Sequence, residues 1–388
     1  MILYGWVVAL GYGQDIVDIP APIEPTCADA LWPGDDWPSE APMVRRELTS
    51  EVAALDAALF PPDVDYTAKD RAGTRTDGVV VLHRGRIVYE RYREPWTKDR
   101  PHLTWSVSKS FTNALTGIAE REGLLSRRDS ICAHYTGLPE ASCAVTIQDL
   151  LDMGSGFTWR ETYEGSSPTT SSVLAMLYGE GAADTARFVG RQPLARAPGA
   201  AWQYSSGDTN LLAGVIGGPL TQRFGERFPW TSLFDVIGMK SAAFERDAAG
   251  TYIGSSYVWA TPRDLARFGY LMLHDGCWNS ERVLPEGWVA FSTELGDPIQ
   301  KAMVRDPDQT LVQARLFWVN QPMPQYGLDK PWCPSVGTDM FAALGHWGQS
   351  ITVVPSQELV VVRVADDRDE TYKHDRTLKA VLRLVEAW

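Results

Sequence analysis

The sequence lacks the features that mark several large classes of protein. Its 388 residues contain 36 lysines and arginines against 49 aspartates and glutamates, with no basic cluster of the kind that nucleic-acid phosphates require. Nucleic acid is therefore not expected as a partner. The six histidines are scattered without H-E-x-x-H, and the cysteines show neither a C-x-x-C pair nor a metal-ligand spacing. No metal site is expected.

Three common enzyme motifs are also missing. The absence of a G-x-S-x-G nucleophile elbow removes the main support for an α/β-hydrolase. There is no G-K-[ST] phosphate-binding loop, and "GYGQD" near the N-terminus lacks the third glycine of a dinucleotide-binding loop. Nucleotide-dependent chemistry therefore has no motif behind it in this chain.

The N-terminus lacks a hydrophobic run of membrane-spanning length. Its first 13 residues, "MILYGWVVALGYG", are mostly apolar and uncharged, yet shorter than the roughly 20 residues of a membrane span. They also lack the positive start and small-residue cleavage site of a signal peptide. We interpret them as the tail of an anchor cut from a longer, exported or periplasmic protein that contacts a membrane. The alternative is an apolar arm packed on the body of a cytoplasmic protein.

Cysteines are few, and two of the five are close in the sequence. In an oxidising compartment Cys132 and Cys143 are expected to form a disulfide. The alternative is that both are buried free thiols. The sequence alone leaves these two interpretations open.

The elements that are present predict an α+β protein. Residues 1–45 are expected to form an extended arm, because proline, tryptophan and acidic residues dominate most of this segment. A helix near residues 48–59 and a β-hairpin over residues 77–92 follow. After a mostly helical region, β-rich segments return near residues 350–366, and an amphipathic helix ends the chain.

This order predicts an antiparallel sheet flanked by N- and C-terminal helices, with an inserted, mostly helical lobe. The body is assigned to residues 46–124 and 250–388, and the lobe to residues 125–249. Within the lobe, Gly217-Gly218-Pro219 is expected to interrupt the helical pattern.

The main chemical signal is "TWSVSKSF", residues 104–111, which places Ser106 three residues before Lys109. On a helix these two side chains lie on one face. A serine hydroxyl needs a neighbouring base to act as a nucleophile, and a lysine desolvated near a helix N-terminus has a lowered pKa. Lys109 is the only one of the eight lysines with a serine three residues ahead. The alternative is an ordinary polar helix start.

Two further segments offer the other groups that acyl transfer needs. Tyr204, in "AWQYSSGD", precedes a hydrophobic helix, and a tyrosine near a lysine can act as a general acid or base. A packing or capping tyrosine is the alternative. "AALGHWGQSITVV" predicts a glycine-containing strand edge that could donate an N–H group to an oxyanion. Taken alone, it is only a strand.

In this order the segments resemble the serine β-lactamase-related family. That family includes class C β-lactamases, D-alanyl-D-alanine carboxypeptidases, family VIII carboxylesterases and 6-aminohexanoate-dimer hydrolases. The resemblance runs from about residue 78 to the end and rests on "WSVSKSFTNALTGIAEREGLL", "VTIQDLLDMGSGFTW", "PGAAWQYSSGDTNLLAGVI", "LFDVIGMKSAAF", "ATPRDLARFGYLMLHDGCWNSERVLPEGWV" and "GHWGQSITVVPSQELVVVRV". The forms "SVSKS" and "YSSGDT" are most similar to the 6-aminohexanoate-dimer hydrolase branch.

The resemblance implies catalytic roles for three side chains. Ser106 would be the acylated nucleophile, Lys109 its proton acceptor, and Tyr204 the group that passes a proton to the leaving group. The oxyanion would lie between the N–H groups of Ser106 and His346, with Gln349 as the alternative if the strand register slips. No cofactor is needed by this mechanism.

The resemblance also implies a substrate-binding region. Tyr163, Trp347 and Gln349 are expected to contact the substrate. Penicillin-binding members carry Lys-Thr-Gly on the third element, whereas this chain reads Ala-Leu-Gly-His there. A substrate carboxylate would therefore lose a charge-assisted hydrogen bond of about 1.5–3 kcal/mol. This departure argues against efficient β-lactamase activity.

Together these features predict a serine hydrolase that cleaves small amides or esters through an acyl-enzyme, and they are compatible with a homodimer. Linear amide oligomers related to 6-aminohexanoate dimer are one expected substrate class, and short esters are the other. A D-amino-acid peptidase or β-lactamase is the alternative within enzymes. A non-catalytic binding protein on the same fold is the alternative of another class.

Overall fold

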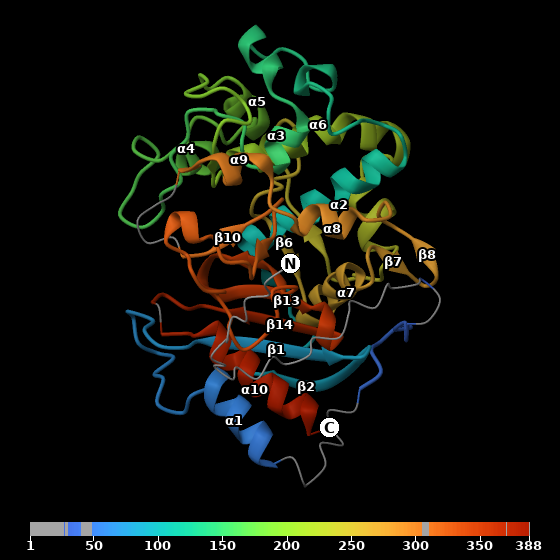
Figure 1. Ribbon diagram of the computed structural model, residues 1–388, viewed down its shortest axis with the longest axis vertical. Coiled ribbons are helices and arrows are strands. Elements are labelled where there is room, and N and C mark those ends of the chain that lie inside the picture. Colours follow the sequence, from blue (N-terminus) through green and yellow to red (C-terminus); the bar gives the residue numbers. More distant parts are fainter. Residues whose placement is uncertain (1–26, 28–29, 40–48, 305–309, 370, 388) are drawn as a thin grey trace, which may run out of the picture.

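The computed structural model describes residues 27, 30–39, 49–304, 310–369 and 371–387 (Figure 1). A seven-stranded antiparallel sheet separates a pair of helices from a larger helical region. In spatial order its strands are β10 (Val312–Gln313), β11 (Trp318–Val319), β12 (Phe341–Gly345), β13 (Gln349–Val354), β14 (Leu359–Ala365), β1 (Thr76–His83) and β2 (Arg86–Tyr92). The paired helices on the outer face are α1 (Thr49–Leu59) and α10 (His374–Glu386).

Helices cover both faces of this sheet, which explains the uninterrupted hydrophobic run in β1. Successive side chains of a strand point to opposite faces. Val79 and Val81 join the outer hydrophobic cluster that α1 and α10 complete, whereas Val80 and Leu82 join the inner cluster beneath the helical region. Figure 1 shows α1 and α10 side by side below the sheet. The α+β class and the hairpin predicted from sequence are confirmed.

The inner side carries the remaining helices. These are α2 (Ser108–Arg121), α3 (Ile147–Leu151), α4 (Ser172–Tyr178), α5 (Thr185–Gly190), α6 (Ser206–Phe224), α7 (Pro262–Leu273), α8 (Trp288–Thr293) and α9 (Asp297–Lys301). Short strands connect them: β3 (His102–Leu103), β4 (Trp202–Gln203), β5 (Ala243–Phe244), β6 (Val258–Ala260), β7 (Cys277–Trp278), β8 (Glu281–Arg282) and β9 (Met303–Val304). None of the helices in the described ranges has the length and apolarity to cross a membrane.

The predicted interruption at Gly217-Gly218-Pro219 is wrong, because α6 continues through these residues to Phe224. Proline inside a helix costs about 3 kcal/mol, since it removes one hydrogen bond and crowds the preceding turn. Here the flanking residues Val215, Ile216 and Leu220 are almost completely buried in the inner cluster. Burying three aliphatic side chains contributes roughly 1.5–3 kcal/mol each, which outweighs the cost of the proline.

The described part of the N-terminal arm packs on the body. Trp32 and Trp37 lie edge-on to the ring of Tyr270 in α7, with centroids 5.6 and 5.4 Å away. A disulfide joins Cys27 of the arm to Cys277, which begins β7 shortly after α7, across a sequence separation of 250 residues. The apolar segment of residues 1–13, for which an anchor or a packed arm was predicted, lies outside the described residues.

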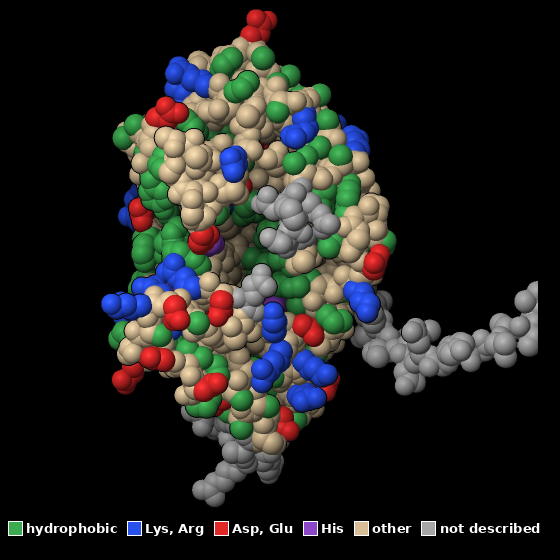
Figure 2. All heavy atoms as spheres, turned by 90° about the vertical axis from the view of Figure 1, so that its left-hand side faces the viewer, with side chains coloured by type: hydrophobic (Ala, Val, Ile, Leu, Met, Phe, Trp, Pro, Cys, Tyr) green, Lys and Arg blue, Asp and Glu red, His purple; other side chains and the backbone are tan. Residues whose placement is uncertain are grey.

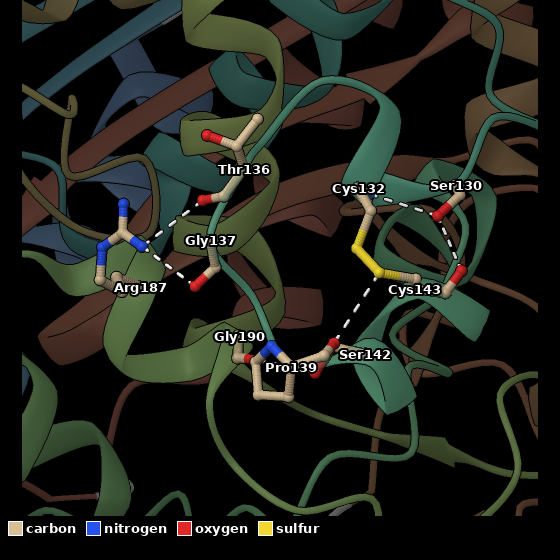
Figure 3. The surroundings of a disulfide bond; sticks show 9 residues. All are labelled: Ser130, Cys132, Thr136, Gly137, Pro139, Ser142, Cys143, Arg187 and Gly190. Carbon is tan, nitrogen blue, oxygen red and sulfur yellow. Dashed lines mark hydrogen bonds between the residues drawn. A yellow bond between two sulfur atoms is a disulfide. The ribbon is translucent and has the colours of Figure 1, made fainter.

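A second disulfide joins Cys132 to Cys143, which decides between the two alternatives left open by the sequence (Figure 3). It closes a short loop against α5. Arg187 of that helix donates to the carbonyl oxygens of Thr136 and Gly137 at 3.4 and 3.2 Å. At the other end of the loop, the Ser142 hydroxyl donates to the Gly190 carbonyl at 2.7 Å. The disulfide and these bonds hold the loop on α5.

Replacing both Cys132 and Cys143 with serine is expected to lower the free energy of unfolding by about 2–4 kcal/mol, because the crosslink restricts the unfolded chain. Urea unfolding of the oxidised proteins measures this difference. Wild type and variant should no longer differ once reductant has opened the disulfides of both. A difference that survives reduction would attribute the loss to the serine side chains instead of the crosslink.

Candidate active site

Ser106 and Lys109 lie at the start of the same helical segment. A single 3-10 turn, η3 (Trp105–Val107), runs directly into α2, so Ser106 precedes the first α-helical residue. Lys109 is 1% exposed, and its Nζ lies 2.9 Å from the Ser106 Oγ. The i to i+3 spacing therefore places the two groups in hydrogen-bonding contact, as the sequence predicts.

The buried amine of Lys109 has two further partners. Its Nζ lies 2.9 Å from the Ser206 Oγ and 3.0 Å from the Ser255 carbonyl oxygen. Burial lowers the pKa of Lys109 to about 8, and the negative charge of Glu161 acts in the opposite direction. Among the described residues no carboxylate forms an ion pair with Lys109, so no direct counter-charge offsets the effect of burial on its pKa.

Tyr204 joins this pair from the segment between β4 and α6. The centroid of its ring lies 5.1 Å from the Lys109 Nζ. The ring of Trp318 stacks on the Tyr204 ring, with the two centroids 5.6 Å apart. Burial raises the pKa of the Tyr204 hydroxyl, and Glu161 adds to the rise, whereas a hydrogen bond to Ser106 opposes it. The structure thus brings together the three side chains that the sequence predicts to be catalytic.

A buried carboxylate fixes the backbone behind Tyr204. Ser205 caps α6 by accepting a hydrogen bond from the Asp208 N–H at 2.9 Å, and its hydroxyl donates to the Asp208 carboxylate at 2.9 Å. The Ser155 hydroxyl donates to the same carboxylate at 2.8 Å. Burial raises the pKa of Asp208 to about 7. These bonds anchor the first turn of α6 and so fix the position of the Tyr204 backbone, which directly precedes Ser205.

The third predicted element, the end of β12, contacts η3 directly. A β-carbon at Gly345 would collide with the carbonyl oxygen of Thr104, so only glycine allows this approach. His346 follows in a single turn, η8 (His346–Gly348). The backbone proposed to donate to an oxyanion therefore lies beside the turn that carries Ser106.

The structure places the predicted substrate contacts in different environments. Tyr163 is close to the site, because its hydroxyl donates to Glu161 at 2.5 Å and lies 3.4 Å from the Ser206 Oγ. Its ring also packs against His346 at 5.2 Å. Trp347 lies edge-on to Trp105, the residue before Ser106, at 5.2 Å.

Gln349 differs from the other predicted contacts. Its side-chain amide donates to the Ala365 carbonyl at 2.6 Å and to the His346 carbonyl at 3.1 Å, and it accepts from the Ala365 N–H at 3.1 Å. The residue is 2% exposed. These contacts make Gln349 a brace between β13 and β14, and they do not support its prediction as a substrate contact.

Sequence reasoning missed Glu161 and Ser206. Ser206 belongs to the "YSSGD" segment, and its place two residues after Tyr204 was the available signal. Glu161 lies in the irregular "TWRETYEG" segment, where no periodicity or motif singles it out. Both contact the Lys109 environment, Ser206 directly and Glu161 through Ser206.

Aromatic side chains cluster around Trp105, the residue before Ser106. Trp105 contacts Tyr257, His346 and Trp347 at centroid distances of 6.2, 6.0 and 5.2 Å. Figure 2 shows that one face of the molecule is hollowed at the height where the sheet meets the helical region, with hydrophobic side chains around the hollow.

The residues present suit proton transfer at an acyl centre. Within the described ranges, no group of three or more histidine, cysteine, aspartate or glutamate side chains could hold a metal ion. A neutral amine in contact with a serine hydroxyl can accept its proton, and a nearby phenol can deliver one to a leaving group.

Comparison with known proteins identifies the family of the chain. A family model described as Beta-lactamase matches residues 58–384. The 6-aminohexanoate-dimer hydrolase of Paenarthrobacter ureafaciens is 25% identical over 346 residues, which cover 83% of this chain and 80% of that protein. A class C beta-lactamase from Rhodobacter sphaeroides has a TM-score of 0.56 at 19% identity, covering 87% of this chain and 99% of that one. A family VIII carboxylesterase has a TM-score of 0.60 at 15% identity, with coverages of 88% and 98%. The two structural likenesses show the fold, and the chain belongs to the beta-lactamase family of hydrolases.

Proposed function

We propose that this protein is a serine hydrolase that cleaves small amides or esters through an acyl-enzyme on Ser106. The Ser106 oxygen attacks the substrate carbonyl carbon as its proton moves to Lys109. The N–H groups of Ser106 and His346 hold the resulting oxyanion. When the intermediate collapses, the carbon–nitrogen or carbon–oxygen bond breaks, Tyr204 gives its phenolic proton to the leaving group, and the Lys109 ammonium returns a proton to the Tyr204 oxygen. Water then attacks the acyl ester by the reverse route and releases the acid.

One observation carries this proposal: Lys109, which is 1% exposed and forms no ion pair with any carboxylate of the described residues, lies 2.9 Å from the Ser106 hydroxyl. Burying an amine without an ion pair costs free energy and lowers its pKa. Strongly shifted pKa values occur most often at functional sites, so this lysine is a candidate catalytic base. The 25% identity to a 6-aminohexanoate-dimer hydrolase supports linear amides of that type as one substrate class. Short esters are the second class, supported by the fold shared with a family VIII carboxylesterase.

A D-amino-acid peptidase or β-lactamase activity has less support. β12 reads Phe-Ala-Ala-Leu-Gly, so the strand beside Ser106 contains no lysine to pair with a substrate carboxylate. A non-catalytic binding protein would not require a lysine with a lowered pKa in contact with a serine.

Turnover of linear 6-aminohexanoate dimer and of p-nitrophenyl butyrate tests the proposal, with wild type and Ser106→Ala prepared in parallel. We expect wild type to hydrolyse both substrates and the variant to hydrolyse neither, because one nucleophile serves both reactions. Cleavage of the ester alone would identify a carboxylesterase and reject the amide class. An unchanged biological activity in Ser106→Ala would favour the binding protein.

A further inference from the structure

We propose that Glu161 and Ser206 are positioning residues that direct the lone pair of Lys109 towards Ser106. This inference rests on the proposed function and adds two residues to it that touch neither the nucleophile nor the leaving group. It concerns how a buried amine with three polar neighbours selects one of them as its proton donor.

Four donors converge on the Glu161 carboxylate. The Ser206 hydroxyl and the Tyr163 hydroxyl each donate to Oε1 at 2.5 Å. The Trp159 indole N–H donates to Oε2 at 2.6 Å, and the Ser206 backbone N–H donates to the same oxygen at 2.9 Å. A carboxylate that accepts four hydrogen bonds from fixed donors is held in a single orientation. The single hydroxyl hydrogen of Ser206 is therefore committed to Glu161.

This commitment determines what Ser206 can offer to Lys109. With its hydrogen pointing at Glu161, the Ser206 oxygen can only accept from the Lys109 Nζ, 2.9 Å away. The Ser255 carbonyl, at 3.0 Å, can also only accept. A neutral amine has two N–H groups and one lone pair. Because two of its three neighbours are obligate acceptors, the lone pair faces the third, the Ser106 hydroxyl at 2.9 Å.

The same arrangement accommodates the charge formed during attack. The proton leaves the Ser106 oxygen as that oxygen bonds to the substrate carbon, and Lys109 becomes an ammonium with three N–H donors. All three neighbours can then accept, and the negative charge of Glu161 is one hydroxyl away. Glu161 gains and loses no proton in this step. Of the described residues, Tyr163 and Tyr204 are ionisable groups beside this cluster, and the ring of His346 packs on Tyr163.

The test compares wild type, Glu161→Gln, Ser206→Ala and the double variant in pH profiles of kcat/KM for p-nitrophenyl butyrate. In Glu161→Gln the new amide can donate to Ser206, whose hydroxyl is then free to donate to Lys109 and misdirect its lone pair. We expect the plateau of kcat/KM at high pH to fall roughly 10²-fold, as for a misplaced catalytic group. The acid limb should also move to lower pH, because the charge that raises the Lys109 pKa is gone.

Ser206→Ala separates positioning from charge. Without the hydroxyl there is nothing to misdirect the lone pair, so adding Glu161→Gln should no longer lower the plateau, although the acid limb should still move. Equal losses in both backgrounds would show that Glu161 does not act through Ser206 and would overturn the proposal. An unchanged plateau in Glu161→Gln would overturn it as well. Glu180→Gln, which removes an exposed charge from the same lobe, is the matched control and should leave the profile unchanged.

Labelling by a fluorophosphonate probe distinguishes this inference from the proposed function. Mass spectrometry should locate the label on Ser106 in wild type, with a rate that follows the same pH profile as hydrolysis. If Ser106 of the folded wild type is not labelled, the proposed nucleophile is wrong. If it is labelled and Glu161→Gln leaves the labelling rate and its pH dependence unchanged, the nucleophile stands and the positioning role is rejected.

Discussion

Replacing Lys109 with methionine is expected to lower kcat/KM for p-nitrophenyl butyrate by about 10²- to 10⁴-fold, the usual contribution of a general base. Methionine is a linear apolar side chain of similar length, so it suits a position that is 1% exposed. In wild type the rate should rise with pH through about 8, because the Lys109 ammonium must lose its proton before it can accept one from Ser106. The variant should lack this rise.

The control for this prediction is Lys240→Met. Lys240 forms an ion pair with Asp35 at 2.9 Å, and its side chain is 72% exposed, so it should affect neither rate nor fold. Circular dichroism of the Lys109 variant should match wild type. Near-complete turnover in a folded Lys109→Met would show that another group serves as the base.

Replacing Asp367 with asparagine is expected to lower the free energy of unfolding by about 3–5 kcal/mol. Asp367 and Arg363 form a two-point ion pair at 2.6 and 2.9 Å, with side chains 6% and 1% exposed. The variant leaves the guanidinium buried without its counter-charge. Arg363 also donates to the Gly348 carbonyl at 3.2 Å, so the substitution is expected to disturb η8, the turn that contains His346, as well. Urea unfolding measures the change.

Glu358→Gln supplies the comparison for the buried pair. Its partner Arg84 lies 2.9 Å away, but the two side chains are 44% and 70% exposed, so we expect a loss of at most about 1 kcal/mol. A similarly small loss for Asp367→Asn would mean that water or a neighbouring group compensates the Arg363 charge.

The parts of the fold that were predicted correctly depend on contacts between near neighbours in the sequence. Ser106 and Lys109 meet because one helical turn separates them, and β1 pairs with β2 through a short turn. The helix through Pro219 was predicted wrongly because local propensity was outweighed by burial against residues far along the chain. Helix propensities depend on neighbouring residues alone and therefore could not predict that burial.

The candidate site shows the same division. The "YSSGD" segment identified Tyr204 but not the hydroxyl of Ser206 two residues later, since serines are ordinary where a helix begins. Glu161 reaches Ser206 across 45 residues from an irregular segment, and nothing in its own neighbourhood indicates that contact. Cys27 and Cys277 are 250 residues apart, so their pairing was equally hidden. These contacts between distant segments are visible in the structure, whereas sequence periodicity does not predict them.

The strand order of the sheet has a consequence for how the chain folds during synthesis. β1 lies between β2 and β14, and Val80 pairs with Val362, a residue made near the end of translation. At about 5–20 residues per second, the β1–β2 hairpin waits roughly 15–60 s with one edge unpaired. Throughout that interval an apolar strand is exposed to neighbouring nascent chains. The hairpin that begins the sheet is therefore a segment that a ribosome-associated chaperone would protect.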